Sequence, residues 1–396
     1  MTNTNIPLDV LVVGGGMYVA GRGVSGADGT IMPALLEGRR AGKIGRIAVS
    51  TTRAETAAAT AAQAQTLAEK MGVDGDCFSY PASGVNEQAF LAAVDEFKPE
   101  AVIVSVPDHL HADVSVPLIE QGLPCLVVKP MAGSLEDAKS MAVAADKAGV
   151  IAQVEFHKRL DESNRLLRDA IRGGQIGDPL YAVVEYSQRK IIPSEVFKSW
   201  AEHSNIFQYL GVHYVDLIQW MTDYSPVRVT AWGQKRFLAG LGIDTWDSMQ
   251  VVIEWDTGDG GRFVSTHITN WIDPNNTSAM SDQKINVVGT KGRFQADQKN
   301  RGVQVVTDDQ GVQDVNPYFT ASWKDDLSGN RVFEGYGIKS VLRFVDDVLA
   351  VRAGNVTIAE LEGSRPGFRA CVVSTAVVEA ARQSLENNSN PVEVSL

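Results

Sequence analysis

The sequence predicts an α/β domain with a doubly wound parallel sheet, followed by an α+β domain with a large, open and mostly antiparallel sheet. Strand-like and helix-like segments alternate across the first 156 residues, and longer strand-like segments follow one another in the second half. Regular alternation is typical of parallel strands joined by helical crossovers. Successive strands separated by turns are typical of an antiparallel sheet.

The first half opens with the apolar run 8–13, which ends abruptly in Gly14 and its two neighbours. Such a short continuous run predicts a strand that is buried on both faces. Further strand-like runs lie at 44–50, 100–106, 124–129 and 150–156. Helical spacing of apolar residues occurs at 30–40, 54–71, 86–97, 111–121 and 134–148. We therefore predict a first domain over residues 1–152.

The second half, residues 153–396, is predicted to be the α+β domain. Strands are expected at 180–189, 227–238, 246–256, 261–271, 284–289 and 292–296. Helices are expected at 161–172, 205–221, 336–353 and 366–386. A short last strand is expected in the tail.

Composition narrows the class of protein. Apolar residues make up 44% of the chain and charged residues 21%, values typical of globular proteins rather than disordered ones. The net charge is −12, which disfavours broad binding to nucleic acid. Three cysteines with no CxxC pair argue against a disulfide framework and a metal site. No signal peptide and no membrane-length apolar run are recognised, so a cytoplasmic protein is expected.

The glycine run after the first strand predicts a dinucleotide site. Gly14 and Gly16 would permit a tight turn and a close approach of backbone N–H groups to a pyrophosphate. The third glycine of the usual GxGxxG spacing is replaced by Val19, and a long loop runs on to Thr30. The alternative is an ordinary glycine-rich surface loop.

The end of the second strand indicates the type of dinucleotide. NAD sites usually place a carboxylate there, whereas this chain has Ser50, Thr51, Thr52 and Arg53. A guanidinium suits a 2′-phosphate, so NADP is favoured over NAD. The alternative is that Arg53 is simply solvated at a helix start.

Two loops that follow strands carry residues suited to chemistry. Lys129 stands at the end of a strand, before Pro130, where partial burial would lower its pKa or position it as a proton donor. His109 and His111 follow Pro107 in the loop after another strand. Ends of strands face the ligand crevice in such sheets, although both histidines have the alternative of a surface role.

A third segment is the apolar helix expected over 205–221. Tyr209, His213 and Asp216 fall on one face of it, at helical offsets. Histidine is the natural base for an alcohol proton near neutral pH. The alternative is a buried histidine whose hydrogen bonds are satisfied by Asp216.

Five segments together resemble the glucose–fructose oxidoreductase/inositol dehydrogenase/rhizopine catabolism (Gfo/Idh/MocA) family. They are GGGMYV, VPDHLHAD, VVKP where the family has Glu-Lys-Pro, GVHYVDLIQW and VVGTKGRFQAD. The resemblance implies a Rossmann domain, a sheet domain that often mediates oligomer contacts, and an active site between the two. It also implies oxidation or reduction of sugars and cyclic polyols with NAD(P).

The resemblance assigns roles to residues of this chain. Lys129 matches the catalytic lysine, His213 the catalytic histidine, and Arg159 an arginine of the family. His111 matches a histidine near the nicotinamide. Cofactor contacts are expected from Gly14, Gly16, Met17, Tyr18, Thr51, Thr52, Arg53, Ser105, Pro107, His111, Lys129 and Pro130.

Three departures from the family pattern stand out. Val128 replaces the glutamate before Lys129, and Tyr209 stands where the family usually has an aspartate. A phenol there would hydrogen-bond the substrate or act as an acid. The glycine loop also carries an insertion of several residues, which would reach over the cofactor or into the substrate cleft.

Substrate contacts are expected near the domain junction and before the helix that carries His213. The candidates are His157, Arg159, Trp200, Asn205 and Asp216. Aromatic faces and amide groups suit a polyol, and ordinary loop packing is the alternative. Trp246, Asp247, Trp271 and Asp273 are weaker candidates.

The sequence thus predicts an NAD(P)-dependent dehydrogenase or reductase of a sugar, sugar derivative or cyclic polyol, assembled as a homodimer or homotetramer. Two alternatives remain open. One is an enzyme that cleaves glycosidic bonds through transient oxidation, and the other is a non-catalytic sensor of dinucleotide or sugar.

Overall fold

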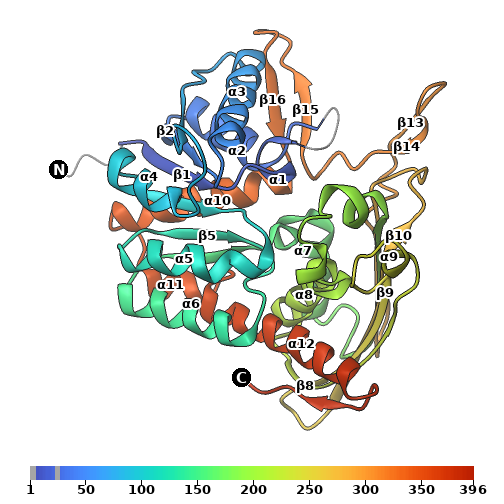
Figure 1. The fold of residues 1–396 in the computed structure, drawn as a ribbon. Helices are drawn as coiled ribbons and strands as arrows, with labels where there is room; N and C mark the ends of the chain where they lie inside the picture. Colours follow the sequence, from blue (N-terminus) through green and yellow to red (C-terminus); the bar gives the residue numbers. More distant parts are fainter. Residues whose placement is uncertain (1–5, 23–26) are drawn as a thin grey trace. The chain divides into compact units, whose positions relative to one another are not determined.

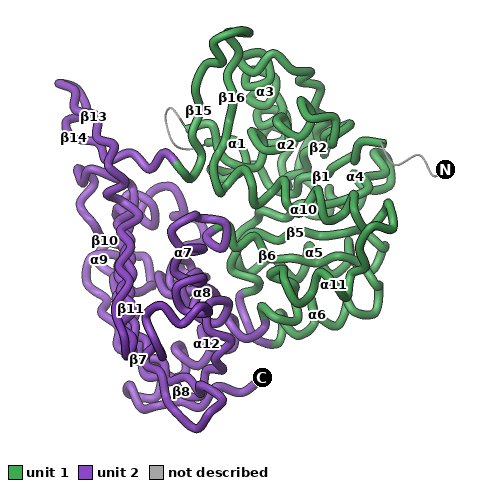
Figure 2. The backbone as a smooth tube through the Cα atoms, turned by 180° about the vertical axis from the view of Figure 1, so that it is seen from behind, with its two compact units in different colours: residues 1–132, 136–157, 318–371 green, residues 133–135, 158–317, 372–396 purple. Residues whose placement is uncertain are grey.

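The computed structural model describes residues 6–22 and 27–396, which form two compact units (Figure 2). Unit 1 holds residues up to 132, 136–157 and 318–371. Unit 2 holds residues 133–135, 158–317 and 372–396. Within the described ranges, no helix is long and apolar enough to cross a membrane.

Unit 1 is built on a six-stranded parallel sheet of order β3-β2-β1-β4-β5-β6 (Figure 1). The strands are β1 (Leu8–Val13), β2 (Ile44–Ser50), β3 (Cys77–Tyr80), β4 (Ala101–Val104), β5 (Cys125–Val128) and β6 (Ala152–Glu155). The order reverses between β1 and β4, and ligands of such sheets bind at that point, beyond the carboxyl ends of the strands. The predicted doubly wound α/β domain is confirmed.

The crossover helices follow the predicted segments closely, except for the short α1, which lies in the segment predicted to be a long loop. They are α1 (Met17–Ala20), α2 (Ile31–Arg40), α3 (Ala54–Met71), α4 (Ala89–Phe97), α5 (His111–Glu120) and α6 (Leu135–Ala148). Helix α3 buries a stripe of small residues, among them Ala57, Ala64 and Ala68. It ends at Gly72, whose φ of 65° is readily available to glycine.

A segment near the end of the chain returns to unit 1. It contains β15 (Ala321–Lys324), β16 (Arg331–Glu334), α10 (Tyr336–Arg352) and α11 (Ile358–Glu362). Phe333, Val341 and Phe344 from this segment join one apolar cluster with Leu35 of α2. The compact units therefore differ from the predicted division at residue 152, because the apolar face of α10 is buried against the first-half helices.

Unit 2 is built on a seven-stranded sheet of order β12-β11-β7-β10-β9-β8-β17. The strands are β7 (Pro179–Arg189), β8 (Ser225–Gln234), β9 (Ser248–Asp256), β10 (Arg262–Asp273), β11 (Ser281–Gly289), β12 (Arg293–Asp297) and β17 (Val392–Glu393). Only the β10–β7 pair is parallel among these strand pairs. The predicted open, mostly antiparallel sheet is confirmed.

Helices of unit 2 lie along one side of this sheet (Figure 2). They include α7 (Glu162–Arg172), α8 (Val212–Thr222) and α12 (Phe368–Glu386), and the short α9 (Phe237–Gly240) follows β8. Strand β9 alternates regularly between buried and half-exposed residues, as expected for a strand with one face packed on helices. The opposite face of the sheet retains exposed apolar side chains, including Tyr181, Trp232 and Ile268.

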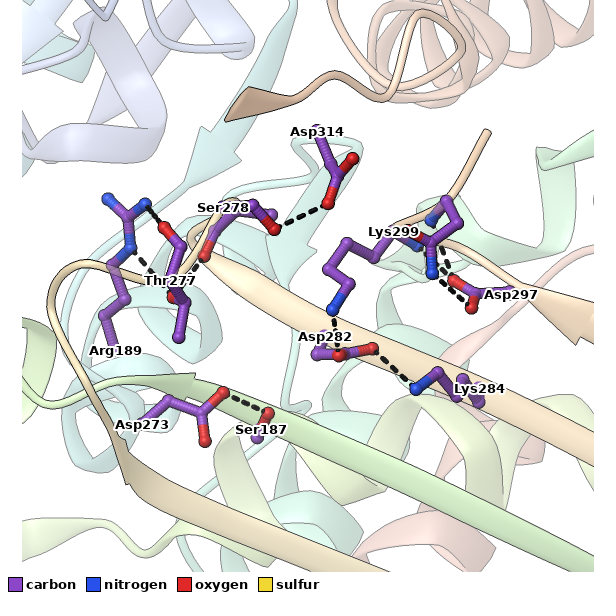
Figure 3. Close-up of polar contacts among 12 residues, drawn as sticks. Ser187, Arg189, Asp273, Thr277, Ser278, Asp282, Lys284, Asp297, Lys299 and Asp314 are labelled. Atoms are coloured by element: carbon purple, nitrogen blue, oxygen red, sulfur yellow. Dashed lines mark hydrogen bonds and ion pairs between the residues drawn. The ribbon is translucent and has the colours of Figure 1, made fainter. Parts of the chain in front are cut away.

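A polar network ties the loop between β10 and β11 to a projecting hairpin (Figure 3). The hairpin pairs β13 (Gln304–Thr307) with β14 (Gly311–Asp314). The Ser278 hydroxyl donates to Asp314 at 2.5 Å, and the Ser187 hydroxyl donates to Asp273 at 2.6 Å. Asp273, a weaker substrate candidate, therefore accepts a hydrogen bond within the sheet domain itself.

Candidate active site

The carboxyl ends of β1, β4, β5 and β6 meet at one edge of the unit 1 sheet, because all four strands are parallel. Most of the cofactor candidates in the sequence lie just beyond these ends. The loops there therefore make the candidate site of unit 1.

The glycine run has the geometry that a dinucleotide requires. Gly14 has a φ of 120°, and a Cβ at that position would lie 2.1 Å from the carbonyl oxygen of Ser105. Any side chain there would displace the backbone that follows β4. A Cβ on Gly16, in contrast, would meet no described atom within 4 Å, so the backbone at the start of α1 faces open space. Backbone of this kind is what allows a pyrophosphate to come close.

The long loop after α1 is only partly described, because residues 23–26 lie outside the described ranges. The role expected for its insertion lies in part on those residues. Arg22, within the described part, donates to the carbonyl oxygen of Thr56 at 3.0 Å. It thus places a guanidinium on the first turns of α3, a feature that the sequence analysis missed.

The end of β2 carries no carboxylate. Ser50 is buried, and its hydroxyl has no hydrogen-bond partner among the described residues. The Thr51 hydroxyl donates to the carbonyl oxygen of Arg53 at 2.7 Å. Arg53 itself is exposed at the start of α3. Two arginines, Arg22 and Arg53, therefore stand at the amino end of α3, where a dinucleotide's adenosine ribose lies in sheets of this kind.

His111 connects two of the loops at this edge. It is 1% exposed, and its Nδ1 lies 2.9 Å from the Pro130 carbonyl oxygen. Its Nε2 lies 3.0 Å from the carbonyl oxygen of Val106. Burial lowers the pKa of His111, against the opposing charge of Asp108. The ring therefore holds the loops after β4 and β5 together, and a contact with the cofactor stays a prediction.

Lys129 is a buried cation of unit 1. It follows β5 directly, is 8% exposed and precedes Pro130 through a cis peptide bond. Burial lowers its pKa to about 8, while Asp108 and Glu155 oppose the shift. Both the ammonium and the amine are therefore accessible near neutral pH, as proton transfer and charge stabilisation require.

A second buried cluster surrounds the end of β6. His157 Nδ1 lies 3.0 Å from Glu155 Oε2 and 3.2 Å from the Tyr18 hydroxyl. The Ser340 hydroxyl donates to the other carboxylate oxygen of Glu155. The rings of Tyr18 and Tyr336 stack with the His157 ring at 6.1 and 5.7 Å. His157, an expected substrate ligand, thus belongs to a carboxylate-centred cluster of unit 1, and Glu155 was missed.

Unit 2 presents His213 near the start of α8. The predicted helix over 205–221 is present, but it begins with a π-helical turn over Phe207–Gly211. The Asn205 side chain caps this turn, accepting from the Gln208 N–H at 2.8 Å. The wider turn changes the regular offset between Tyr209 and His213, and π turns of this kind occur frequently at functional sites. His213 is 2% exposed, and its ring lies 6.5 Å from that of Tyr186.

Asp216 forms an ion pair with Arg159 rather than with His213. The guanidinium donates to both carboxylate oxygens, at 2.8 and 2.6 Å. Burial raises the pKa of Asp216, and Arg159 opposes that rise. The two expected substrate ligands therefore bind each other and hold α8 to the segment that follows β6.

Aromatic rings gather around the π-helical turn. Tyr209 stacks on Trp271 at 5.5 Å and meets Phe197 and Trp200 edge-on at 5.2 and 6.2 Å. Phe197 and Trp200 are 4.5 Å apart. Trp200 and Tyr209 are only partly buried, so each leaves ring surface for a ligand. Sequence reasoning found Trp200 and Tyr209, but it missed Phe197, which carries no chemical signal of its own.

Two weaker candidates have structural partners. Asp247 accepts from the backbone N–H groups of Phe237 and Leu238, and it caps α9. Trp271 donates from its indole N–H to Gln188 at 2.8 Å and is fully buried.

Two family models match the chain. Residues 10–156 match the model described as the oxidoreductase family with an NAD-binding Rossmann fold. Residues 164–295 match the Gfo/Idh/MocA C-terminal domain. The chain belongs to the Gfo/Idh/MocA oxidoreductase family. Membership accounts for the order of the two sheets and confirms the resemblance seen in the sequence.

Curated relatives match the chain in part. The rhizopine catabolism protein MocA of Rhizobium meliloti is 28% identical over 162 residues, 41% of this chain and 50% of that protein. The 1,5-anhydro-D-fructose reductase of Ensifer adhaerens is 29% identical over 198 residues, 49% and 55% of the two chains. The scyllo-inositol 2-dehydrogenase (NAD(+)) of Bacillus subtilis is 28% identical over 198 residues, 49% and 54%. The matches span about half the length of these relatives.

Solved structures share the fold over the whole chain. The apo scyllo-inositol dehydrogenase of Lactobacillus casei superposes with a TM-score of 0.69 at 15% identity, covering 98% and 99% of the two chains. GenD2 from gentamicin A biosynthesis, solved in complex with NAD, has a TM-score of 0.68 at 19% identity, covering 100% and 98%. These likenesses confirm the fold of this family member.

Proposed function

We propose that this family member is an NAD(P)-dependent dehydrogenase or reductase of a sugar, sugar derivative or cyclic polyol. The observation that carries the proposal is Lys129, a buried lysine at the ligand edge of the Rossmann sheet. A buried cation is retained where it serves a purpose, and perturbed pKa values concentrate at functional sites. The names of the relatives, which include inositol dehydrogenases and a sugar reductase, support the substrate class.

The proposed chemistry assigns one task to each unit's key residue. The bound nicotinamide would supply or accept the hydride. His213 accepts the proton of the substrate hydroxyl during oxidation. Lys129 donates a hydrogen bond to the same oxygen and stabilises the negative charge that develops there. Tyr209 hydrogen-bonds the substrate, in the place of the family's usual aspartate.

The aromatic rings around Tyr209 support a ring-shaped polyol substrate. Sugar and cyclitol rings carry C–H faces that pack on aromatic surfaces, while their hydroxyls need hydrogen bonds. Trp200 offers such a surface and is partly exposed. We propose that it packs on the substrate ring.

Trp200→Ala is expected to raise KM for the best polyol about tenfold with kcat changed less than about threefold. The lost stacking contributes to binding in the ground state and the transition state alike, at about 1.4 kcal/mol. Steady-state kinetics of the two proteins check this. Trp323→Ala is the matched control, because Trp323 is 46% exposed on β15 and has no proposed role. A fall in kcat with unchanged KM would contradict the proposed contact.

We propose NADP as the preferred cofactor. Arg22 and Arg53 stand at the amino end of α3 with no carboxylate at the end of β2 to repel a 2′-phosphate. NAD is bound in the solved structure of GenD2, a protein of similar fold. The preference of this chain is a matter for titration.

Titration of the purified chain with NADPH and NADH, followed by nicotinamide fluorescence, tests this preference. NADPH is expected to bind at least about tenfold more tightly, because two guanidinium groups meet the extra phosphate. Arg53→Ala should weaken NADPH about tenfold and leave NADH unchanged. Equal or tighter binding of NADH would overturn the preference and keep the enzyme proposal, whereas binding of neither would overturn both.

We also propose that the chain forms a homodimer or homotetramer through the uncovered face of the unit 2 sheet. Tyr181, Trp232 and Ile268 are each more than 40% exposed there. Contiguous exposed apolar surface of this kind typically marks an interface.

A further inference from the structure

One buried carboxylate of unit 1, that of Glu155, has no role in the chemistry proposed above. Glu155 ends β6 and is 2% exposed. Its register partner across the parallel β5–β6 pair is Val128, the residue immediately before Lys129. The glutamate and the lysine therefore leave neighbouring strands at the same edge of the sheet, both shielded from water.

Side chains from two segments hold this carboxylate. His157 Nδ1 lies 3.0 Å from Oε2, and the Ser340 hydroxyl donates to Oε1. The Tyr18 hydroxyl lies 3.2 Å from the same His157 nitrogen. Hydrogen bonds onto a buried carboxylate fix its orientation. Because these two partners come from α10 and from the residues after β6, the carboxylate is held from two sides.

Several charged and titratable groups face this place. Asp108 and Glu155 both act on Lys129 by their charge, against the effect of burial. His157 contacts Glu155, and Tyr18 and Tyr336 in turn contact the His157 ring. Asp108 lies in the loop after β4 and is buried as well. A lysine in this environment stays an ammonium at neutral pH only if the neighbouring carboxylates offset its desolvation.

We propose that Glu155 is a positioning residue, whose carboxylate keeps Lys129 in the ammonium form that hydrogen-bonds the substrate oxygen. This inference rests on the proposed function for the role of Lys129, but the electrostatic effect of Glu155 on Lys129 does not. It also gives a reason for Val128, where the sequence resemblance expects a glutamate. In this chain a carboxylate, that of Glu155, stands on the neighbouring strand β6, at the position paired with Val128.

The test is the pH dependence of turnover in Glu155→Gln. The amide keeps the shape of the side chain and loses the charge. Because a negative neighbour is removed, the alkaline limb of the kcat profile should move down by about one pH unit. Turnover at about pH 8 should then fall roughly fivefold, whereas turnover at about pH 6 should be unchanged, since Lys129 is charged there in both proteins. A merely structural defect would lower turnover at every pH.

The reciprocal variant moves the carboxylate instead of removing it. In Val128→Glu/Glu155→Gln, the new glutamate stands beside Lys129 on its own strand, and the limb should return to within about 0.3 unit of its original place. Should Glu155→Gln fail to fold, Val128→Glu alone keeps the proposal testable, since an added carboxylate should move the limb upward. Glu96→Gln, an exposed charge loss on α4, is the matched control and should leave the profile unchanged.

A second readout needs no turnover. Reductive methylation by formaldehyde and borane modifies only the neutral amine, and mass spectrometry measures it at Lys129 against Lys98, whose side chain is 72% exposed. At neutral pH, Glu155→Gln should raise the relative rate at Lys129 several-fold. If Glu155→Gln changes neither the alkaline limb of the kcat profile nor the labelling rate of Lys129, the inference is overturned. If Glu155→Gln raises the labelling rate of Lys129 but the parent protein oxidises no polyol, the effect of Glu155 on Lys129 stands. The proposed function is then overturned instead.

Discussion

Lys129→Ala and His213→Ala are each expected to lower kcat for polyol oxidation by roughly 10²–10⁴-fold. The first removes the cation that stabilises the developing oxyanion, and the second removes the base that accepts the hydroxyl proton. Steady-state kinetics with the best substrate of a sugar and polyol panel measure the loss. Dinucleotide affinity should stay within a fewfold of the parent, because the glycine run and the end of β2 are untouched.

The pH profile of the parent enzyme provides a check on the same assignment. Burial lowers the pKa of Lys129 to about 8. Above that value the amine is neutral and no longer stabilises negative charge, so kcat should fall as the pH rises through about 8. The Lys129→Ala protein should lack this alkaline limb. If both alanine variants keep full turnover, the proposed chemical roles are wrong, whichever cofactor binds.

Asp216→Ala is expected to be the most destabilising of the single changes considered. It removes the carboxylate that receives both hydrogen bonds of the largely buried Arg159 guanidinium. Removing one partner of a buried pair costs about 3–5 kcal/mol of the free energy of unfolding, because the remaining charge stays desolvated. Urea unfolding followed by tryptophan fluorescence measures the difference.

An exposed ion pair of unit 1 gives the matched control. Lys98 and Asp95 are 72% and 80% exposed at the side chain, and Asp95→Ala should cost less than about 1 kcal/mol. Replacing both buried partners by apolar residues, in Arg159→Met/Asp216→Leu, should recover most of the lost stability, since apolar side chains need no ionic partner. A loss for Asp216→Ala no larger than that of Asp95→Ala would show that the pair adds no stability and would favour a direct role in substrate binding.

Local sequence patterns were sufficient for most of the fold. The apolar run of β1 and the alanine-rich α3 lie where their periodicity predicts them, because burial pattern and propensity act within a few residues. The strand β3 and the two hairpins escaped prediction. They are short and, apart from the buried Phe333 of β16, carry half-exposed or exposed residues, so they lack the apolar pattern that reveals a buried strand.

The candidate site was predictable in its residue types and only partly in its contacts. Lys129, His213 and the glycine run are identified by type, by position after a strand or within an apolar helix, and by resemblance to the family. Arg22 and Glu155 carried no such signal. Arg22 lies in a loop that conforms to no motif. Glu155 lies on β6, at the position paired with Val128, where the resemblance expects a glutamate.

By itself, the sequence determined which segments are strands and helices, that the first half is a nucleotide-binding type of sheet, and which residue types are available for chemistry. Only the tertiary structure decided that Asp216 binds Arg159 rather than His213, and that residues 318–371 join unit 1. It also decided that Glu155 stands level with Val128, the residue before Lys129. These outcomes depend on strand register and on the packing of residues distant in sequence, whereas helix and strand formation depend on neighbours along the chain.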